Sequence, residues 1–333
     1  MATEFELIAG FAERFVTPDS VRVGIGDDGA VVEPGAFDVV SMDTMVEEVH
    51  FRRRFSSAED VGWKLTASNL SDIGAMGAVP GPLFVSMALA SPPDEEWVNG
   101  FCAGVQQAVD QLTANPQQVT VVGGDMTSTR GPVVVTMTIL GSLKGTQPVL
   151  RSTASAGETI VVSSLPGCSA AGLEVLRAGR EQEEPLEKLV QAHLRPRPPL
   201  VLGRELALQS MPSAMIDTSD GLIQDLSHIL EASSVGATID LSGLEIPAPL
   251  LVAEQEGLGS VRDWILGGGE DYCLVMTVPT GHVDALQRYA TRHGQRPIII
   301  GTTCDARQGV EVIGPAGEMV DEFSAGFEHF ETL

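Results

Sequence analysis

The segment 37–51, FDVVSMDTMVEEVHF, constrains the fold more than any other part of the chain. Phe37, Val39 and Val40 predict a buried strand, and a run of polar side chains follows where this strand should end. The polar residues are Ser41, Asp43, Thr44, Glu47, Glu48 and His50. Folds that layer helices on sheets place their chemistry at strand ends, although Asp43 alone could equally be a turn residue or a helix cap.

Two glycine-containing segments place further carboxylates at predicted turns. Residues 21–29, VRVGIGDDG, match GxGxxG formally, but Asp27 and Asp28 occupy the place of a dinucleotide's pyrophosphate. A glycine turn that presents carboxylates to a hard cation fits the segment better, with a plain hairpin turn as the alternative. A predicted strand at 119–122 ends in Gly123, Gly124 and Asp125, so another acid is expected at a strand end.

Later segments repeat this association of acids with element ends. Residues 58–76 predict a helix in which Asp72 lies among small and apolar residues, where a buried carboxylate is costly unless it is paired or bound to metal. A short strand at 215–216 leads into Asp217, and Ser219 or Asp220 is predicted to cap the following helix. The run GGGED at 267–271 predicts a backbone that approaches a ligand closely.

These carboxylates predict magnesium if they converge. Two unit charges 4 Å apart repel by roughly 4 kcal/mol at an effective dielectric of 20, so several such pairs need a cation. Magnesium takes oxygen ligands and keeps waters that contact phosphates, whereas a set of aspartates argues against zinc and copper. The chain has no GxxxxGK[ST] motif and only three lysines, Lys64, Lys144 and Lys188, so metal bridges are expected to carry the binding of a nucleotide's phosphates.

The length of 333 residues favours two domains. The polar segment 145–157 is the expected boundary, which gives an N-terminal domain at 1–147 and a C-terminal domain at 148–333. Predicted strands and helices are mixed rather than strictly alternating, so α+β layers are favoured over a doubly wound sheet.

The charge balance and apolar pattern exclude some partners. Twenty basic and 45 acidic residues give a net charge of −25, which argues against a nucleic-acid backbone as partner. No apolar run approaches the roughly 18 residues of a membrane span, and residues 1–15 carry acids where a signal peptide carries bases, which predicts a cytoplasmic protein without a membrane partner. The four cysteines are far apart and are predicted to be reduced core thiols.

Seven ordered motifs, with EFELI near the start, resemble the thiamine-monophosphate kinase family: GIGDDGA, SMDTMVEEVHF, NLSDIGAMGAVP, VVGGDMTS, DTSDGL, GGGEDY and GFEHF. The resemblance spans nearly the whole chain. It implies transfer of the γ-phosphate of ATP to thiamine phosphate, with several Mg²⁺ ions. It also implies the fold of aminoimidazole ribonucleotide synthetase, in which an N-terminal domain with ATP and magnesium sites forms a dimer barrel and a C-terminal α+β domain follows.

The resemblance also implies roles for individual residues, and no catalytic base is expected because a phosphate monoester acceptor is already ionised near neutral pH. The implied metal ligands are Asp28, Ser41, Met42 through its backbone, Asp43, Asp72, Asp125, Asp217 and Asp220. The implied ATP contacts are Gly124, Asp125, Arg151 and Ser219, and the implied thiamine phosphate contacts are His50, Glu270 and Phe327. Phe327 stands where the family often has tryptophan or tyrosine, and a phenyl ring can still stack on the cationic thiazolium.

Two alternatives remain open at this point. The first is a sibling enzyme on the same scaffold, of the aminoimidazole ribonucleotide synthetase, selenophosphate synthetase or hydrogenase-maturation dehydratase type. The chain lacks an N-terminal cysteine beside a lysine and a C-terminal cysteine tail, which favours the thiamine enzyme. The second is an acidic cation-binding protein without catalysis, against which the absence of EF-hand loop spacing argues.

Overall fold

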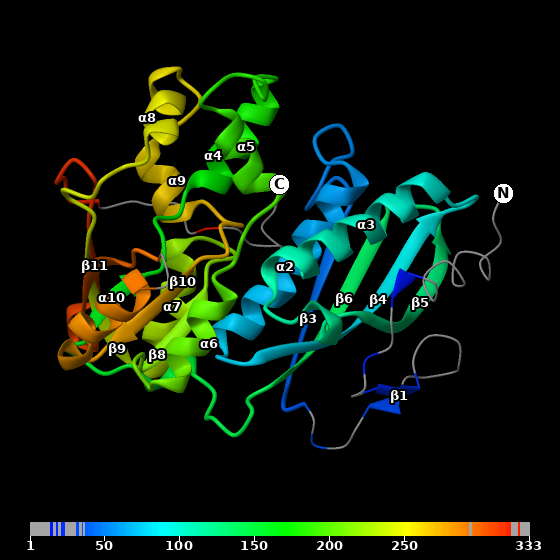
Figure 1. Cartoon of the computed structure of the whole chain (residues 1–333). Helices are drawn as coiled ribbons and strands as arrows, with labels where there is room; N and C mark the ends of the chain where they lie inside the picture. The colour runs from blue at the N-terminus through cyan, green and yellow to red at the C-terminus, as the bar shows by residue number, and fades with distance from the viewer. Residues whose placement is uncertain are drawn as a thin grey trace. The chain divides into compact units, whose positions relative to one another are not determined.

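The computed structural model describes residues 14–15, 18, 21–23, 31–32, 35, 37–292, 295–320 and 326 (Figure 1). The chain divides into two compact units. The first comprises Met1–Ile73 and Ala78–Gly145, and the second comprises Gly74–Gly77 and Thr146–Leu333. The assignment of ATP, magnesium and dimer contacts to a domain at 1–147 stays a prediction.

A four-stranded sheet forms the centre of unit 1. Its order is β3 (Val39–Val46), β6 (Val134–Ser142), β4 (Val79–Ala90) and β5 (Val121–Thr129). Strand β6 is antiparallel to both β3 and β4, whereas β5 is parallel to β4. Two short strands, β1 (Val21–Val23) and β2 (Val31–Val32), form a separate antiparallel pair.

Two helices of unit 1, α2 (Ala58–Ala75) and α3 (Glu95–Leu112), pack tightly against each other. A Cβ atom on Gly104 would collide with the backbone of Glu59, so glycine permits this close approach. Helix α3 begins after Asp94, whose side chain accepts the backbone N–H of Trp97 at 3.1 Å, and a short 3-10 turn, Pro116–Gln118, precedes β5.

Strand β3 is longer and more amphipathic than expected. It continues through Val46, so Ser41 and Asp43 lie inside the strand, and the expectation that it ends before them is wrong. Alternate residues point to opposite faces: Val39 and Met45 are buried, whereas Val40 is 66% exposed and Met42 is 65% exposed. The expectation that Val40 is buried is therefore also wrong, because one face of this sheet is open in the chain.

A six-stranded sheet forms the centre of unit 2, in the order β12-β9-β11-β7-β10-β8. Its neighbouring strands are antiparallel except β9 and β12, which are parallel. The strands are β7 (Thr159–Val162), β8 (Ala214–Asp217), β9 (Val235–Asp240), β10 (Leu274–Val278), β11 (Ile298–Asp305) and β12 (Val310–Ile313). This mixture of layers confirms the predicted α+β class.

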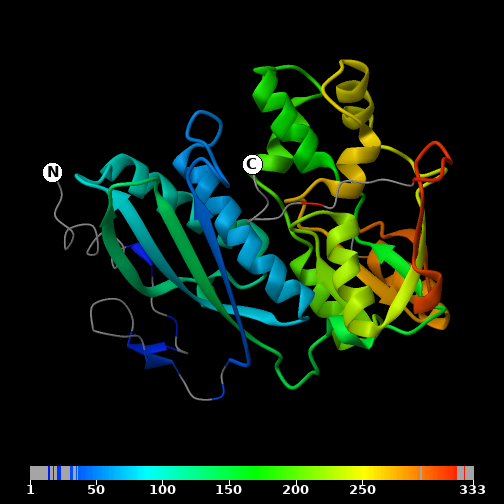
Figure 2. The ribbon, with the colours of Figure 1, turned by 180° about the vertical axis from the view of Figure 1, so that it is seen from behind.

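Seven helices are described in unit 2. Helices α6 and α10 share a core cluster with the sheet that includes Leu206, Met276 and Leu286. Helices α4, α5, α8 and α9 form a separate group (Figures 1 and 2). The helices are α4 (Cys168–Ala178), α5 (Glu187–Leu194), α6 (Leu200–Leu208), α7 (Leu222–Ser233), α8 (Ala248–Gln255), α9 (Val261–Gly267) and α10 (Val283–Arg292).

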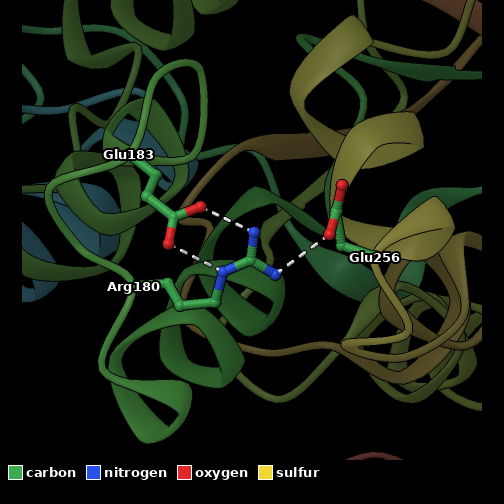
Figure 3. A network of polar contacts seen from close by, with 3 residues as sticks. All are labelled: Arg180, Glu183 and Glu256. Carbon is green, nitrogen blue, oxygen red and sulfur yellow. Dashed lines mark hydrogen bonds and ion pairs between the residues drawn. The ribbon is translucent and has the colours of Figure 1, made fainter.

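An exposed ion-pair network joins the segments that follow α4 and α8 (Figure 3). Arg180 donates to both carboxylate oxygens of Glu183, at 3.0 and 2.6 Å, and to Glu256 at 3.4 Å. The hydrogen bonds and charge of Glu183 raise the pKa of Arg180, and Arg180 in turn lowers the pKa of Glu183. Because the network is exposed, its contribution to stability is small.

All four cysteines lie in the described part of the chain and are free, as predicted. Cys102 and Cys273 are buried, whereas Cys168 and Cys304 are half-buried, so only two of them are core thiols. No helix among the described residues is long and apolar enough to cross a membrane.

Candidate functional site

The sheet and helix of unit 1 bring Ser41, Asp43 and Asp72 together. Strand alternation points Ser41 and Asp43 towards α2, and Ser41 Oγ donates a hydrogen bond to Asp72 Oδ2. Burial raises the pKa of Asp43 to about 7, the neighbouring charge of Asp72 adds to the increase, and a hydrogen bond from Ser68 opposes it. Ser68 and Asp72 are four residues apart on α2, so one face of the helix meets Asp43.

The pair of carboxylates leaves one oxygen unsatisfied. Among the described residues, Asp43 Oδ2 is buried and accepts no hydrogen bond. A buried oxygen without a partner is costly, and a second carboxylate beside it adds repulsion. A hard cation would satisfy the oxygen and cancel the repulsion, so these residues fit Mg²⁺.

Met42 and Asp125 lie on the other face of the same sheet. The strand register places Asp125 beside Ser86, Ser86 beside Thr136 and Thr136 beside Thr44, in the row next to that of Asp43. Strand β5 continues to Thr129, so the expectation that Asp125 stands at a strand end is wrong.

Gly124 has a packing role in addition to its predicted contact with ATP. A Cβ atom at this position would collide with the carbonyl of Val85 on the neighbouring strand. Glycine therefore allows β4 and β5 to pair closely just before Asp125.

Asp217 in unit 2 is the last residue of β8, and it is 4% exposed. The strand-end prediction is confirmed here. Thr218, the next residue, holds the end of β8 against Cys273. Its backbone N–H donates to the carbonyl of Cys273 at 2.8 Å, and its Oγ1 accepts the N–H of Cys273 at 3.1 Å.

Asp225, which sequence reasoning did not identify, supports the start of α7. Its Oδ2 accepts the backbone N–H groups of Asp220 at 3.1 Å and of Gly221 at 3.0 Å. The predicted cap by Ser219 or Asp220 is wrong, since the cap residue is Gly221 and the carboxylate comes from inside the first turn. Burial raises the pKa of Asp225 to about 7, against the effect of the backbone hydrogen bonds from Gly221 and Asp220.

The segments 218–221 and 267–272 lie back to back. The N–H of Glu270 donates to Ser219 O at 2.8 Å, and the N–H of Tyr272 donates to Thr218 O at 2.9 Å. A Cβ atom on Gly269 would lie 2.5 Å from Ser219 O. The glycine run therefore lets two chain segments approach each other, and its approach to a ligand stays a prediction.

Asp271 and His193 are further buried groups that the sequence did not reveal. Asp271 accepts the backbone N–H groups of Gly167 at 2.7 Å and Ser169 at 3.0 Å, at the N-terminal end of α4. Burial raises the pKa of Asp271 to about 6, although these hydrogen bonds lower it. Ser169 Oγ lies 3.0 Å from His193 Nδ1, and Glu270 Oε2 lies 3.5 Å from the same nitrogen. The acid in GGGED was a visible signal for Asp271, whereas no local pattern marks His193.

The remaining predicted residues are spread over both units. His50 is half-buried, and its Nδ1 accepts the backbone N–H of Val46 at 3.1 Å. Arg151 is exposed, and its carbonyl accepts the hydroxyl of Ser233 at 2.8 Å. Asp28 and Phe327, like the turn at Asp27, lie outside the described residues.

The chain next to Phe327 contacts the start of α7. Gly326 has a φ of +84°, and a Cβ atom there would lie 2.7 Å from the carbonyl oxygen of Asp220. Gly326 therefore lies beside a segment that holds predicted metal and ATP residues.

Within the described ranges, no group of three or more histidine, cysteine, aspartate or glutamate side chains could hold a metal ion. The structure thus brings together Ser41, Asp43 and Asp72, and it does not assemble the whole predicted ligand set within either unit.

Two family models match the chain. Residues 26–143 match the model described as AIR synthase related protein, N-terminal domain, and residues 155–314 match AIR synthase related protein, C-terminal domain. Thiamine-monophosphate kinase of Haemophilus influenzae is 36% identical over 340 residues, which cover 98% of each chain.

Solved structures show the same relationship. The crystal structure of thiamine-monophosphate kinase from Stenotrophomonas maltophilia K279a has a TM-score of 0.81 and 34% identity, and the match covers 94% of this chain and 98% of that one. The structure of AaThiL complexed with AMPPCP and TMP has a TM-score of 0.75 and 26% identity, with 99% of each chain covered.

Proposed function

Because the chain belongs to the thiamine-monophosphate kinase family, we propose that it transfers the γ-phosphate of ATP to thiamine phosphate and forms thiamine diphosphate. The relative solved with AMPPCP, an analogue of ATP, and TMP supports this pair of substrates. In this chain, the pairing of Asp43 with Asp72 carries the proposal, because such a pair is expected where a cation and polyphosphate bind.

Magnesium is the metal that these residues fit best. Ser41, Asp43 and Asp72 would hold it in unit 1, where the unsatisfied Asp43 Oδ2 offers a ligand oxygen. When bound, the metal supplies positive charge that neutralises the phosphate oxygens. The other proposed ligands are Asp28, the backbone of Met42, Asp125, Asp217 and Asp220.

The proposed substrate contacts follow the family resemblance residue by residue. Gly124, Asp125, Arg151 and Ser219 are assigned to ATP, and His50, Glu270 and Phe327 to thiamine phosphate. Because His50 Nδ1 accepts the N–H of Val46, a neutral imidazole carries its proton on Nε2. His50 can therefore donate a hydrogen bond to a substrate phosphate.

The transfer itself needs no general base. The second pKa of a phosphate monoester is about 6, so the acceptor is already ionised near neutral pH. A phosphate oxygen of thiamine phosphate attacks the γ-phosphorus in line, the new P–O bond forms as the bond to the bridging β,γ-oxygen breaks, and ADP leaves. The role of the protein is to position the two anions and to stabilise the charge between them.

A homodimer is part of the proposal. The open face of the four-stranded sheet exposes Val40 and Met42, and a second copy of the chain would cover them as the family resemblance implies. The cytoplasmic location stays a prediction from the sequence.

The decisive experiment incubates the protein with ATP, MgCl₂ and a panel of phosphate acceptors, and separates the products by chromatography. Among the acceptors, only thiamine phosphate should be phosphorylated, and its product should be thiamine diphosphate. Asp72→Asn should abolish turnover without loss of the fold, whereas Asp110→Asn, an exposed aspartate on α3, should leave turnover unchanged. Near-normal kcat in Asp72→Asn would contradict the assignment, and turnover of another acceptor would favour a sibling enzyme.

A further inference from the structure

Three side chains in unit 2, Ser169, His193 and Glu270, form a buried polar cluster that phosphoryl transfer does not by itself require. Ser169 is fully buried on α4 and His193 is 5% exposed on α5. Both the hydroxyl of Ser169 and the carboxylate of Glu270 face one nitrogen, His193 Nδ1, at 3.0 and 3.5 Å. We call these three residues the His193 cluster.

The arrangement excludes a serine nucleophile. A serine, histidine and acid act together when the serine and the acid contact different ring nitrogens, so that the proton can pass through the ring. Here both partners contact Nδ1. Because Ser169 and Glu270 both face Nδ1, the imidazole cannot take a proton from Ser169 on one nitrogen while the other nitrogen faces Glu270. The arrangement fits a role in positioning rather than in proton transfer.

We propose that His193 is a positioning residue that orients Glu270 for thiamine phosphate. The inference rests on the proposed function and adds a residue to it. A proton on Nδ1 faces Ser169 Oγ at 3.0 Å and Glu270 Oε2 at 3.5 Å, so the imidazole attracts the carboxylate across a distance longer than a charge-assisted hydrogen bond. The Glu270 side chain is 28% exposed, so one oxygen faces His193 while the rest of the carboxylate can meet a ligand.

The backbone of Glu270 supports a role for its side chain. Its φ of +64° lies in the left-handed region, which disfavours residues with a Cβ atom, and it follows three glycines. A glutamate in a conformation that favours glycine points to a role for its carboxylate at that place.

The cluster is itself held by helix α4. Asp271 binds the N–H of Ser169 at 3.0 Å, and Ser169 Oγ then fixes the ring of His193. Helices α4 and α5 lie side by side in both views (Figures 1 and 2). The orientation of Glu270 thus depends on the packing of a helix pair as well as on its own segment.

The test measures KM for thiamine phosphate, KM for ATP and kcat in the full-length protein. His193→Leu removes the donor, so KM for thiamine phosphate should rise roughly ten- to one-hundred-fold while KM for ATP and kcat stay close to wild type. His193→Asn should restore most of the affinity, because its amide nitrogen occupies the place of Nδ1. Gln191→Leu, an exposed position on α5, is the matched control.

The same kinetic measurements in a Glu270→Gln background distinguish an effect that acts through Glu270 from a general disruption of the local structure. If His193 acts through Glu270, His193→Leu should add no further loss there. Equal losses in the Leu and Asn variants, or a parallel loss of kcat and both KM values, would overturn the inference. A wild-type protein that does not phosphorylate thiamine phosphate would overturn the proposed function, whereas an active wild type with unchanged KM in His193→Leu would overturn this inference alone.

Discussion

Asp43→Asn should stabilise the metal-free protein at neutral and alkaline pH. The pKa of Asp43 is about 7 in the folded chain against an ordinary value of 3.8, because of burial and the charge of Asp72. The folded state therefore holds a proton that the unfolded state has lost between these two values. Protonated Asp43 makes its full favourable contribution to the unfolding free energy below about pH 4, and this contribution is lost as the pH rises to 7.

The size of the effect follows from the two pKa values. A tenfold change in proton affinity corresponds to about 1.36 kcal/mol, so ionised Asp43 costs the metal-free protein roughly 4 kcal/mol at pH 8 and under about 2 kcal/mol at pH 5. Asparagine has the same shape without the charge. Asp43→Asn should therefore exceed wild type in unfolding free energy by these amounts.

Urea unfolding in EDTA at pH 5 and pH 8 measures the difference. Asp125→Asn is the matched control, because Asp125 is exposed on the opposite face of the sheet and its substitution should change stability by less than about 0.5 kcal/mol. Added MgCl₂ should raise the stability of wild type at pH 8 by more than that of Asp43→Asn, which lacks one of the proposed ligands. An Asp43→Asn protein that is no more stable than wild type at pH 8 would refute the reasoning.

Three smaller predictions concern packing and surface charge. Gly124→Ala should cost roughly 1–3 kcal/mol in thermal unfolding, because the new methyl group collides with the carbonyl of Val85, and an unchanged melting temperature would contradict this. Asp225→Ala should destabilise the start of α7 by about 1–3 kcal/mol through two orphaned backbone N–H groups, seen as faster amide hydrogen exchange there. Glu183→Gln should leave the urea midpoint unchanged, since its pairing with Arg180 is exposed; a clear drop would show a structural role.

The bounds of helix α2 were predictable from the sequence. The helix expected at 58–76 is α2, which ends one residue earlier, at Ala75. Helices α5, α8 and α9 were not predicted, because each has only seven or eight residues and α5 begins in a charged stretch. Two turns are too short for a helical period to stand out.

The ends of β3 and β5 are harder to predict, because polar residues do not end these two strands. In β3 and β5 the polar residues continue the strand, since one face of the sheet is open and the other meets Ser68 and Asp72 of a polar helix face. The approach of Asp43 and Asp72 agrees with the predicted convergence of aspartates from separate segments, whereas the bound metal stays a prediction. The contacts of His193 and Asp271 join positions far apart in the chain, which one sequence does not reveal.

The back-to-back segments 218–221 and 267–272 make the proposed nucleotide and substrate residues of unit 2 one mechanical part. Ser219 and Glu270 are joined through main-chain atoms, with no room for a methyl group at Gly269. A shift of segment 218–221 should therefore be accompanied by a shift of segment 267–272. If Ser219 contacts ATP and Glu270 contacts thiamine phosphate as proposed, a substitution that reshapes one contact should also disturb the other, which would couple the two specificities.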